Sequence, residues 1–192
     1  MKICTFQALS SSERTLTVYS PDLIGDNTCS DYTDESMRQG FSWRSGNVDF
    51  YTIDSWGMVI DVEVFLNESV QLSPDAVRAI QVPFTIGPQG VGFYCTATFI
   101  DVLGVVSKED FGTVPCYLPI PPGEYALVFE QGFMPDWGAD GYLGEDENNT
   151  TSMWGKLWFN LETNAEAKIL VQDSGLRPIY PLNMDAEPIS EY

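Results

Sequence analysis

Residues 57–66 read Gly57-Met58-Val59-Ile60-Asp61-Val62-Glu63-Val64-Phe65-Leu66 and carry the clearest strand signal in the chain. It starts as a continuous apolar run and then alternates apolar and acidic side chains. This pattern predicts a strand that emerges from a buried core and becomes half-exposed, so we expect a central strand of a sheet. Residues 15–19 and 47–53 also alternate with a period of two and predict half-buried strands.

The rest of the chain repeats this pattern. Turn signals recur about every ten residues, supplied by 16 Gly and 12 Pro, and they separate short segments rich in Val, Ile, Phe, Tyr and Thr. We therefore expect about nine strands in all, forming an antiparallel β-sandwich. The further strands are predicted at 79–86, 91–99, 113–118, 124–131, 156–161 and 167–172. Residues 87–90 predict a hairpin between 84–86 and 91–93, and Pro83 and Pro115 indicate an edge or a bulge.

One helix and one helical turn interrupt the strands. Thr33 is a capping residue, Asp34 and Glu35 follow it, and Gly40 can close the helix. Residues 73–78 predict a second helical turn. The fold class is therefore mainly β, with one or two short helices. We expect one acidic β-sandwich domain over residues 1–176 and an extended, Pro-rich acidic C-terminal tail over residues 177–192.

The charge of the chain excludes several functions. Its 192 residues include 28 Asp and Glu, 9 Lys and Arg and no His, which gives a net charge of -19. Such a chain is not expected to bind nucleic acid. Without His it has no Ser-His-Asp or Cys-His nucleophile and no His-ligated zinc. Carboxylate-pair glycosidases and oxygen-ligand metal sites remain open.

The cysteines and apolar runs indicate the compartment. The four cysteines are Cys4, Cys29, Cys95 and Cys116, and they form no Cys-x-x-Cys motif. No N-terminal apolar run predicts a signal peptide, and no run approaches the 18 residues of a membrane span. We therefore expect a cytoplasmic protein with reduced, inert thiols and no membrane partner.

The densest acidic cluster lies in residues 136–147. We predict that this cluster binds a basic partner, with Trp137 and Tyr142 as aromatic anchors. The predicted partner-binding residues are Asp136, Trp137, Asp140, Tyr142, Glu145, Asp146 and Glu147. The stretch also resembles a twelve-residue calcium loop, with Asp136, Asp140 and Glu147 as candidate Ca²⁺ ligands. Gly138 replaces an expected ligand, so an intact EF-hand is not predicted. A solvated acidic loop is the alternative.

Two further patterns are compatible with a catalytic or sugar-binding role. Asp61 and Glu63 share one face of a strand and could form a glycosidase pair, but an outward-facing strand surface explains them more simply. Trp154, Lys156 and Trp158 share a face that could stack sugars, although core packing of the tryptophans is the favoured interpretation. No cofactor is predicted apart from the Ca²⁺ alternative.

Several segments follow one another along the chain in a characteristic order. They are 15–19, Tyr32-Thr33-Asp34-Glu35, Gly40-Phe41, Val48-Asp49-Phe50, the strand ending in Phe65-Leu66-Asn67, Val82-Pro83-Phe84-Thr85-Ile86 and Pro122-Gly123-Glu124-Tyr125-Ala126-Leu127. This ordered set, which covers about residues 9–131, resembles the competence protein J (ComJ) family, whose members inhibit a bacterial DNA-entry nuclease. The resemblance implies inhibition by binding rather than catalysis. The matched positions are fold determinants, so they imply no binding residues.

The leading hypothesis is a non-enzymatic inhibitor, of the immunity type, that blocks a basic nuclease or toxin. The alternative is an acidic β-sandwich module that binds Ca²⁺ or carbohydrate.

Overall fold

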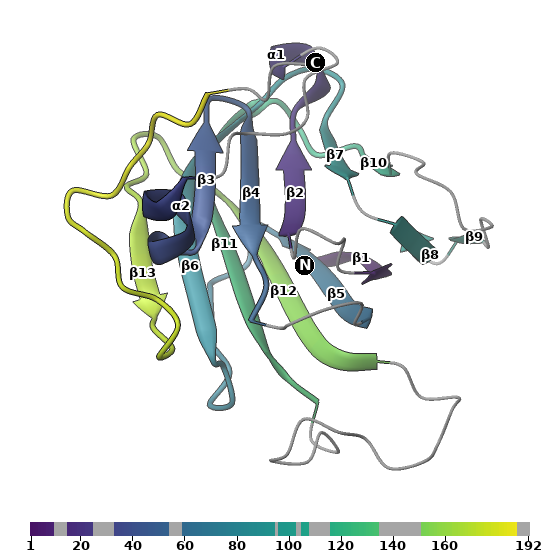
Figure 1. The fold of residues 1–192 in the computed structure, drawn as a ribbon. Helices are drawn as coiled ribbons and strands as arrows, with labels where there is room; N and C mark the ends of the chain where they lie inside the picture. The colour runs from purple at the N-terminus through teal and green to yellow at the C-terminus, as the bar shows by residue number, and fades with distance from the viewer. Residues whose placement is uncertain are drawn as a thin grey trace, which may run out of the picture.

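The computed structural model describes residues 1–9, 15–24, 33–53, 59–94, 96–102, 105–107, 116–134 and 151–187. Within them the chain forms two sheets and two short helices (Figure 1). The large sheet has the order β13-β6-β11-β12-β5-β1-β8-β9. Its strands are β1 (Lys2–Leu9), β5 (Val59–Leu66), β6 (Arg78–Ile86), β8 (Thr96–Val102), β9 (Val105–Ser107), β11 (Gly123–Phe133), β12 (Thr151–Leu161) and β13 (Lys168–Val171).

The small sheet has the order β10-β7-β2-β4-β3. Its strands are β2 (Thr15–Tyr19), β3 (Phe41–Arg44), β4 (Asn47–Tyr51), β7 (Val91–Tyr94) and β10 (Cys116–Leu118), and the helices are α1 (Pro21–Ile24) and α2 (Asp34–Gln39). Among the described residues, no helix is long and apolar enough to cross a membrane.

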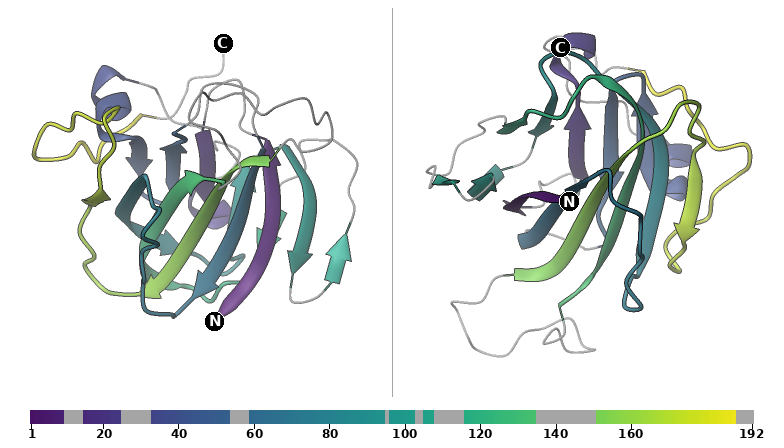
Figure 2. Two further views of the ribbon diagram at one scale, coloured as in Figure 1. Left: turned by 90° about the horizontal axis from the view of Figure 1, so that it is seen from below. Right: turned by 180° about the vertical axis from the view of Figure 1, so that it is seen from behind.

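The two sheets pack face to face, which confirms the predicted sandwich (Figure 2). Aromatic pairs join the sheets across the core: the ring centroids of Phe6 and Phe93 lie 5.0 Å apart, and those of Phe50 and Phe129 lie 5.2 Å apart. Pairing between neighbouring strands is antiparallel except between β12 and β5, which run parallel. The pattern is therefore that of an antiparallel sandwich with one parallel pair in the large sheet.

The stretch 57–66 contains the central strand that its pattern predicts. β5 lies between β12 and β1 in the large sheet, and Ile60, Val62 and Val64 are at most 1% exposed in the core. Asp61 and Glu63 alternate with them and face outward, because successive side chains of a strand point to opposite faces.

The helix at Thr33 is confirmed in detail. The Thr33 hydroxyl accepts a hydrogen bond from the Ser36 backbone N–H, and the Ser36 side chain accepts one from the Thr33 N–H. Gly40 ends α2 with φ +83°, and a Cβ there would lie 2.7 Å from Leu176 Cδ2, so only glycine fits without strain. Residues 73–78 form a turn rather than a helix, with Ala76 N–H donating to the Ser73 carbonyl.

Two strand predictions are wrong. Residues 84–86 and 91–93 do not form a paired hairpin, because only Gly87 and Gly90 pair. The strand before this turn, β6, belongs to the large sheet, and the strand after it, β7, belongs to the small sheet. The predicted strand 91–99 is likewise two strands, in different sheets. The physical reason is burial, because the apolar sides of β6 and β7 face each other across the core instead of lying side by side.

Candidate functional site

Trp43 closes one open side of the sandwich. It lies on β3, the last strand of the small sheet, and its indole Nε1 donates to the Pro83 carbonyl of β6, in the other sheet, at 2.6 Å. β13 pairs with β6 only over Ala79–Gln81, so Pro83 lies where β6 has no partner on that side. Pro83 therefore lies at a locally unpaired edge of β6, as its sequence signal predicts, although β6 is not an edge strand over its whole length. This hydrogen bond fixes the orientation of the indole ring.

The C-terminal segment, residues 176–187, lies along this open side (Figure 1). Its start is buried, with Leu176 only 2% exposed. Further on, Gln39 exchanges two hydrogen bonds of 2.8 Å with the backbone of Asn183, and the Ala186 N–H donates to the Trp43 carbonyl at 2.9 Å. The described part of the predicted tail is thus extended, but it is held against α2 and β3 rather than projecting freely.

A buried ion pair anchors the segment where it leaves the sheet. Arg78 Nε lies 2.5 Å from Asp173 Oδ2, and the two side chains are 8% and 13% exposed. The other Asp173 oxygen accepts hydrogen bonds from the Gly175 and Leu176 N–H groups. Burial alone would raise the pKa of Asp173, but the hydrogen bond and charge of Arg78, together with these N–H groups, lower it.

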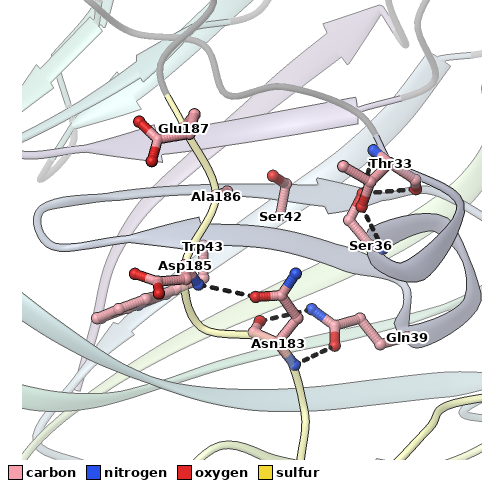
Figure 3. Close-up of a pocket in the computed structure, with 9 residues that line it drawn as sticks. All are labelled: Thr33, Ser36, Gln39, Ser42, Trp43, Asn183, Asp185, Ala186 and Glu187. Atoms are coloured by element: carbon pink, nitrogen blue, oxygen red, sulfur yellow. Dashed lines mark hydrogen bonds between the residues drawn. The ribbon is translucent and has the colours of Figure 1, made fainter.

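Two pockets flank the Trp43 side chain, and we call them together the Trp43 groove. The first, of about 100 Å³, lies between α2, β3 and the C-terminal segment, and is lined by Thr33, Ser36, Gln39, Ser42, Trp43, Asn183, Asp185, Ala186 and Glu187. In Figure 3 both acidic side chains project to the side of the segment on which the Trp43 ring lies. The second, of about 210 Å³, is lined by Trp43, Ser45, Pro83, Phe84, Thr85, Glu124, Tyr125, Glu162, Asn164 and Ala165.

The groove is acidic. Asp185, Glu187, Glu124 and Glu162 are all exposed, and none of them forms an ion pair with a described cation. No Lys or Arg occurs among the described residues that line the two pockets. The groove therefore presents a fixed indole between two sets of uncompensated carboxylates.

The two strand-face patterns lie together on the outer face of the large sheet. In the parallel pairing of β5 and β12, Asp61 is opposite Trp154 and Glu63 is opposite Lys156. Glu63 forms an ion pair with Lys2 at 2.9 Å, which fits an outward-facing strand surface.

The tryptophans of this face are not part of the cluster between the two sheets, but Trp158 is buried, at 5% exposed, so the core-packing interpretation holds in part. Trp158 is buried instead on the outer face by stacking on Phe65, with ring centroids 4.2 Å apart. Lys156 lies 5.1 Å from the Trp154 ring centroid and donates to the Ser73 hydroxyl at 2.6 Å. Glu63 and Lys156 of this face are therefore both engaged in polar contacts.

The acidic loop lies outside the described residues. This holds for every predicted partner-binding or Ca²⁺-binding residue: Asp136, Trp137, Asp140, Tyr142, Glu145, Asp146 and Glu147. In sequence the loop follows β11 and precedes β12. These two strands are neighbours in the large sheet, with β6 beside β11 and β5 beside β12. The described ranges contain no group of three or more His, Cys, Asp or Glu side chains that could hold a metal ion.

Sequence reasoning missed the Trp43 groove, because its residues come from distant parts of the chain. Glu124 and Glu162 become neighbours only when β11 pairs with β12, where the Glu162 N–H donates to the Glu124 carbonyl. Asp185 and Glu187 belong to the segment read as a tail. Pro83 is a local signal, since it marks the edge beside which the groove opens.

Comparison with known proteins places the fold. The structure is similar to the crystal structure of ComJ from Bacillus subtilis, an inhibitor of the DNA degrading activity of NucA, with a TM-score of 0.52, 16% sequence identity, and coverage of 84% of this chain and 99% of that one. It is also similar to a protein described as crocagin biosynthetic gene J, with a TM-score of 0.44, 10% identity, and coverage of 83% and 97%. No curated protein matches the chain by sequence.

The family model for competence protein J (ComJ) matches residues 8–150. The match starts at the end of β1 and extends beyond residue 131, where the resemblance ends, so it includes the acidic loop. It spans well over half of the chain, and the shared fold agrees with it. By this match, the chain belongs to the competence protein J (ComJ) family.

Proposed function

We propose that this protein inhibits a DNA-degrading nuclease by binding to it. The observation that carries the proposal is the ComJ family match over residues 8–150. The Bacillus subtilis ComJ, which has the same fold, inhibits the DNA degrading activity of NucA. The partner proposed here is accordingly a nuclease, and the action is occlusion of its surface rather than catalysis by this chain.

The net charge of -19 supports this mode of action. A nuclease must attract the phosphate backbone of DNA, so it carries positive charge around its active cleft. An acidic protein is attracted to the same surface, competes with DNA for it and gains a faster association rate. The partner we propose is therefore basic, and this chain is proposed to bind it in the cytoplasm without binding nucleic acid itself.

The acidic loop is the proposed primary contact. Residues 136–147 contain five acids and no Lys or Arg, with Trp137 and Tyr142 among them. Carboxylates steer the encounter with a basic surface, while buried aromatic side chains contribute most of the binding energy at interfaces. The loop lies inside the region matched by the family model.

The loop is tested by removing its charge. The variant Asp140→Asn/Glu145→Gln/Glu147→Gln should inhibit the nuclease about tenfold more weakly at low salt, as expected for three exposed charge pairs. The matched control is Asp61→Asn/Asp75→Asn/Glu166→Gln, which makes the same change in net charge elsewhere. Inhibition is measured by the rate of DNA cleavage. Equal inhibition by the loop variant and the wild type would refute the loop assignment.

The alternative function is a module that binds Ca²⁺ or carbohydrate through the same loop. If Asp136, Asp140 and Glu147 bound Ca²⁺, millimolar Ca²⁺ would raise the melting temperature of the protein. Our proposal expects no such rise. A hypothesis more similar to our proposal is immunity toward a basic toxin that is not a nuclease. It predicts a complex with that toxin and no effect on DNA cleavage.

A further inference from the structure

The Trp43 groove contains two acidic residues that lie opposite each other on neighbouring chain segments. Glu124 on β11 lies directly opposite Glu162 at the end of β12, since Tyr125 pairs with Leu161 and the Glu162 N–H donates to the Glu124 carbonyl at 3.0 Å. Like charges directly opposite each other on neighbouring strands are destabilising. No described cation pairs with either one. The pair therefore does not serve stability.

The other wall of the groove adds to this charge. Asp185 and Glu187 border the first pocket, and Trp43 borders both pockets. The hydrogen bond from the indole to Pro83 holds the ring in place before any ligand arrives. An aromatic ring that is already oriented, with carboxylates on both sides, is the arrangement that binds an organic cation by stacking and by charge-assisted hydrogen bonds.

We propose that the Trp43 groove binds an arginine side chain of the protein partner. A guanidinium is planar, so it stacks on the indole face while its five N–H donors reach carboxylates at its edges. A lysine ammonium is a compact, strongly hydrated charge that gains less from a flat ring. A metal ion fits poorly, because Ca²⁺ needs six to eight oxygen ligands and no metal-binding group of acids is present among the described residues.

The size of each pocket, taken singly, favours a side chain over a whole small molecule. The pockets measure about 100 and 210 Å³, whereas sites for cofactors and drug-sized ligands usually measure about 300–1,000 Å³. Two exposed acids in each pocket suit a protruding side chain of a basic protein. The role of this contact in inhibition rests on the proposed function, but the binding of the cation does not.

The binding is tested on the full chain labelled with 5-fluorotryptophan, with the Trp43 resonance assigned from Trp43→Phe. The probes are three capped tripeptides with Arg, Lys or the neutral citrulline between two glycines. The arginine peptide should shift the Trp43 resonance saturably, the lysine peptide should bind several-fold more weakly, and the citrulline peptide should cause no shift. Equal shifts with arginine and citrulline would overturn the proposal.

Variants locate the site. Glu124→Gln/Glu162→Gln should reduce the affinity for the arginine peptide about tenfold, the effect of two exposed charge pairs. Asp61→Asn/Asp75→Asn removes the same charge away from the groove and should leave the affinity within about twofold. All four side chains are exposed or partly exposed, so we expect both variants to fold. Equal losses in the two variants would mean that net charge, not the groove, attracts the peptide.

The same two variants separate this inference from the proposed function. If Glu124→Gln/Glu162→Gln inhibits the nuclease more weakly than Asp61→Asn/Asp75→Asn, the groove contacts the nuclease. If the wild type inhibits, and the groove variant inhibits equally and binds the arginine peptide equally, the groove proposal fails while the function stands. If the wild type binds the arginine peptide at Trp43 but inhibits no nuclease, the groove is supported and the proposed function fails.

Discussion

Replacing Asp173 with Asn should destabilise the protein through the ion pair that anchors its C-terminal segment. The substitution leaves the Arg78 guanidinium, whose side chain is only 8% exposed, without a negatively charged partner, so that only neutral acceptors such as the Tyr51 carbonyl at 2.9 Å face it among the described residues. Removing one member of a buried pair typically costs about 3–5 kcal/mol. Since both side chains retain some exposure, we expect about 3 kcal/mol, which lowers the melting temperature by roughly 6–12 °C in a domain of this size.

The pH dependence of this difference provides a second check. The folded pKa of Asp173 lies below its ordinary value of 3.8, so the stability contributed by the pair is fully present above about pH 4 and is lost as the pH falls through the folded pKa. The difference between wild type and Asp173→Asn should therefore shrink below about pH 4. Urea unfolding at pH 7, 5 and 3 measures it.

The matched control is Glu166→Gln. It removes one negative charge from an exposed carboxylate whose only described ion pair is a 3.5 Å contact with Lys168, so its effect should stay within about 0.5 kcal/mol. It also corrects for the relief of repulsion in a chain of net charge -19. Equal stability of Asp173→Asn and Glu166→Gln at pH 7, or a difference that persists undiminished at pH 3, would refute the reasoning.

Three further substitutions test the fold and the groove by thermal and urea unfolding. Thr33→Ala removes the cap of α2 and should cost about 1 kcal/mol, whereas no loss would mean that the cap is not formed. Gly40→Ala forces a left-handed residue at φ +83° and places a Cβ 2.7 Å from Leu176 Cδ2, so it should cost about 2 kcal/mol or more. Glu124→Gln/Glu162→Gln removes the like-charge pair and should stabilise the protein by about 0.2–1 kcal/mol. A loss of stability there would contradict the opposed pair.

Local patterns in the sequence predict the elements of this fold well. The alternation in 57–66 places Ile60, Val62 and Val64 in the core and Asp61 and Glu63 outside, because a half-buried strand must alternate. The spacing from Thr33 to Gly40 predicts α2 with both of its caps, since capping depends on neighbouring residues alone. Such features require no knowledge of distant contacts.

Strands β1 and β3 escaped prediction. β3 has only four residues, too few for the period of two to stand out. β1 spans eight residues, and its described core side chains are Cys4 and Phe6. The strand conformation of β1 depends on pairing with β5, which is distant in sequence. That of β3 depends on pairing with β4, its neighbour in sequence.

The assignment of strands to sheets could not be predicted from local patterns. Gly87 to Gly90 makes a tight turn, yet whether the flanking strands pair or separate depends on β11 and β2, which hold β6 and β7 in different sheets. The C-terminal segment is a similar case. Its composition predicts an extended chain, but its docking depends on Gln39, 144 residues from Asn183.

One part of the candidate site can be recognised in the sequence, and the other part only in the folded structure. The acidic loop 136–147 is visible in the sequence because its charges are consecutive, and its role stays a prediction. The Trp43 groove becomes visible only after folding, because it combines β3, the β11–β12 pair and the C-terminal segment. Surface sites assembled from several segments leave no periodic signal.

The central claim, inhibition of a nuclease by direct binding, is tested most directly by an activity titration. A DNA-degrading nuclease from the same source is titrated with the purified protein in excess Mg²⁺ and Ca²⁺, at low and moderate salt, and the rate of DNA cleavage is followed. We predict saturable inhibition near one-to-one that weakens as salt rises, because the association is electrostatic. Inhibition that disappears on adding more metal would show that the acidic chain merely removes metal ions, and an unchanged cleavage rate at excess protein would contradict the account.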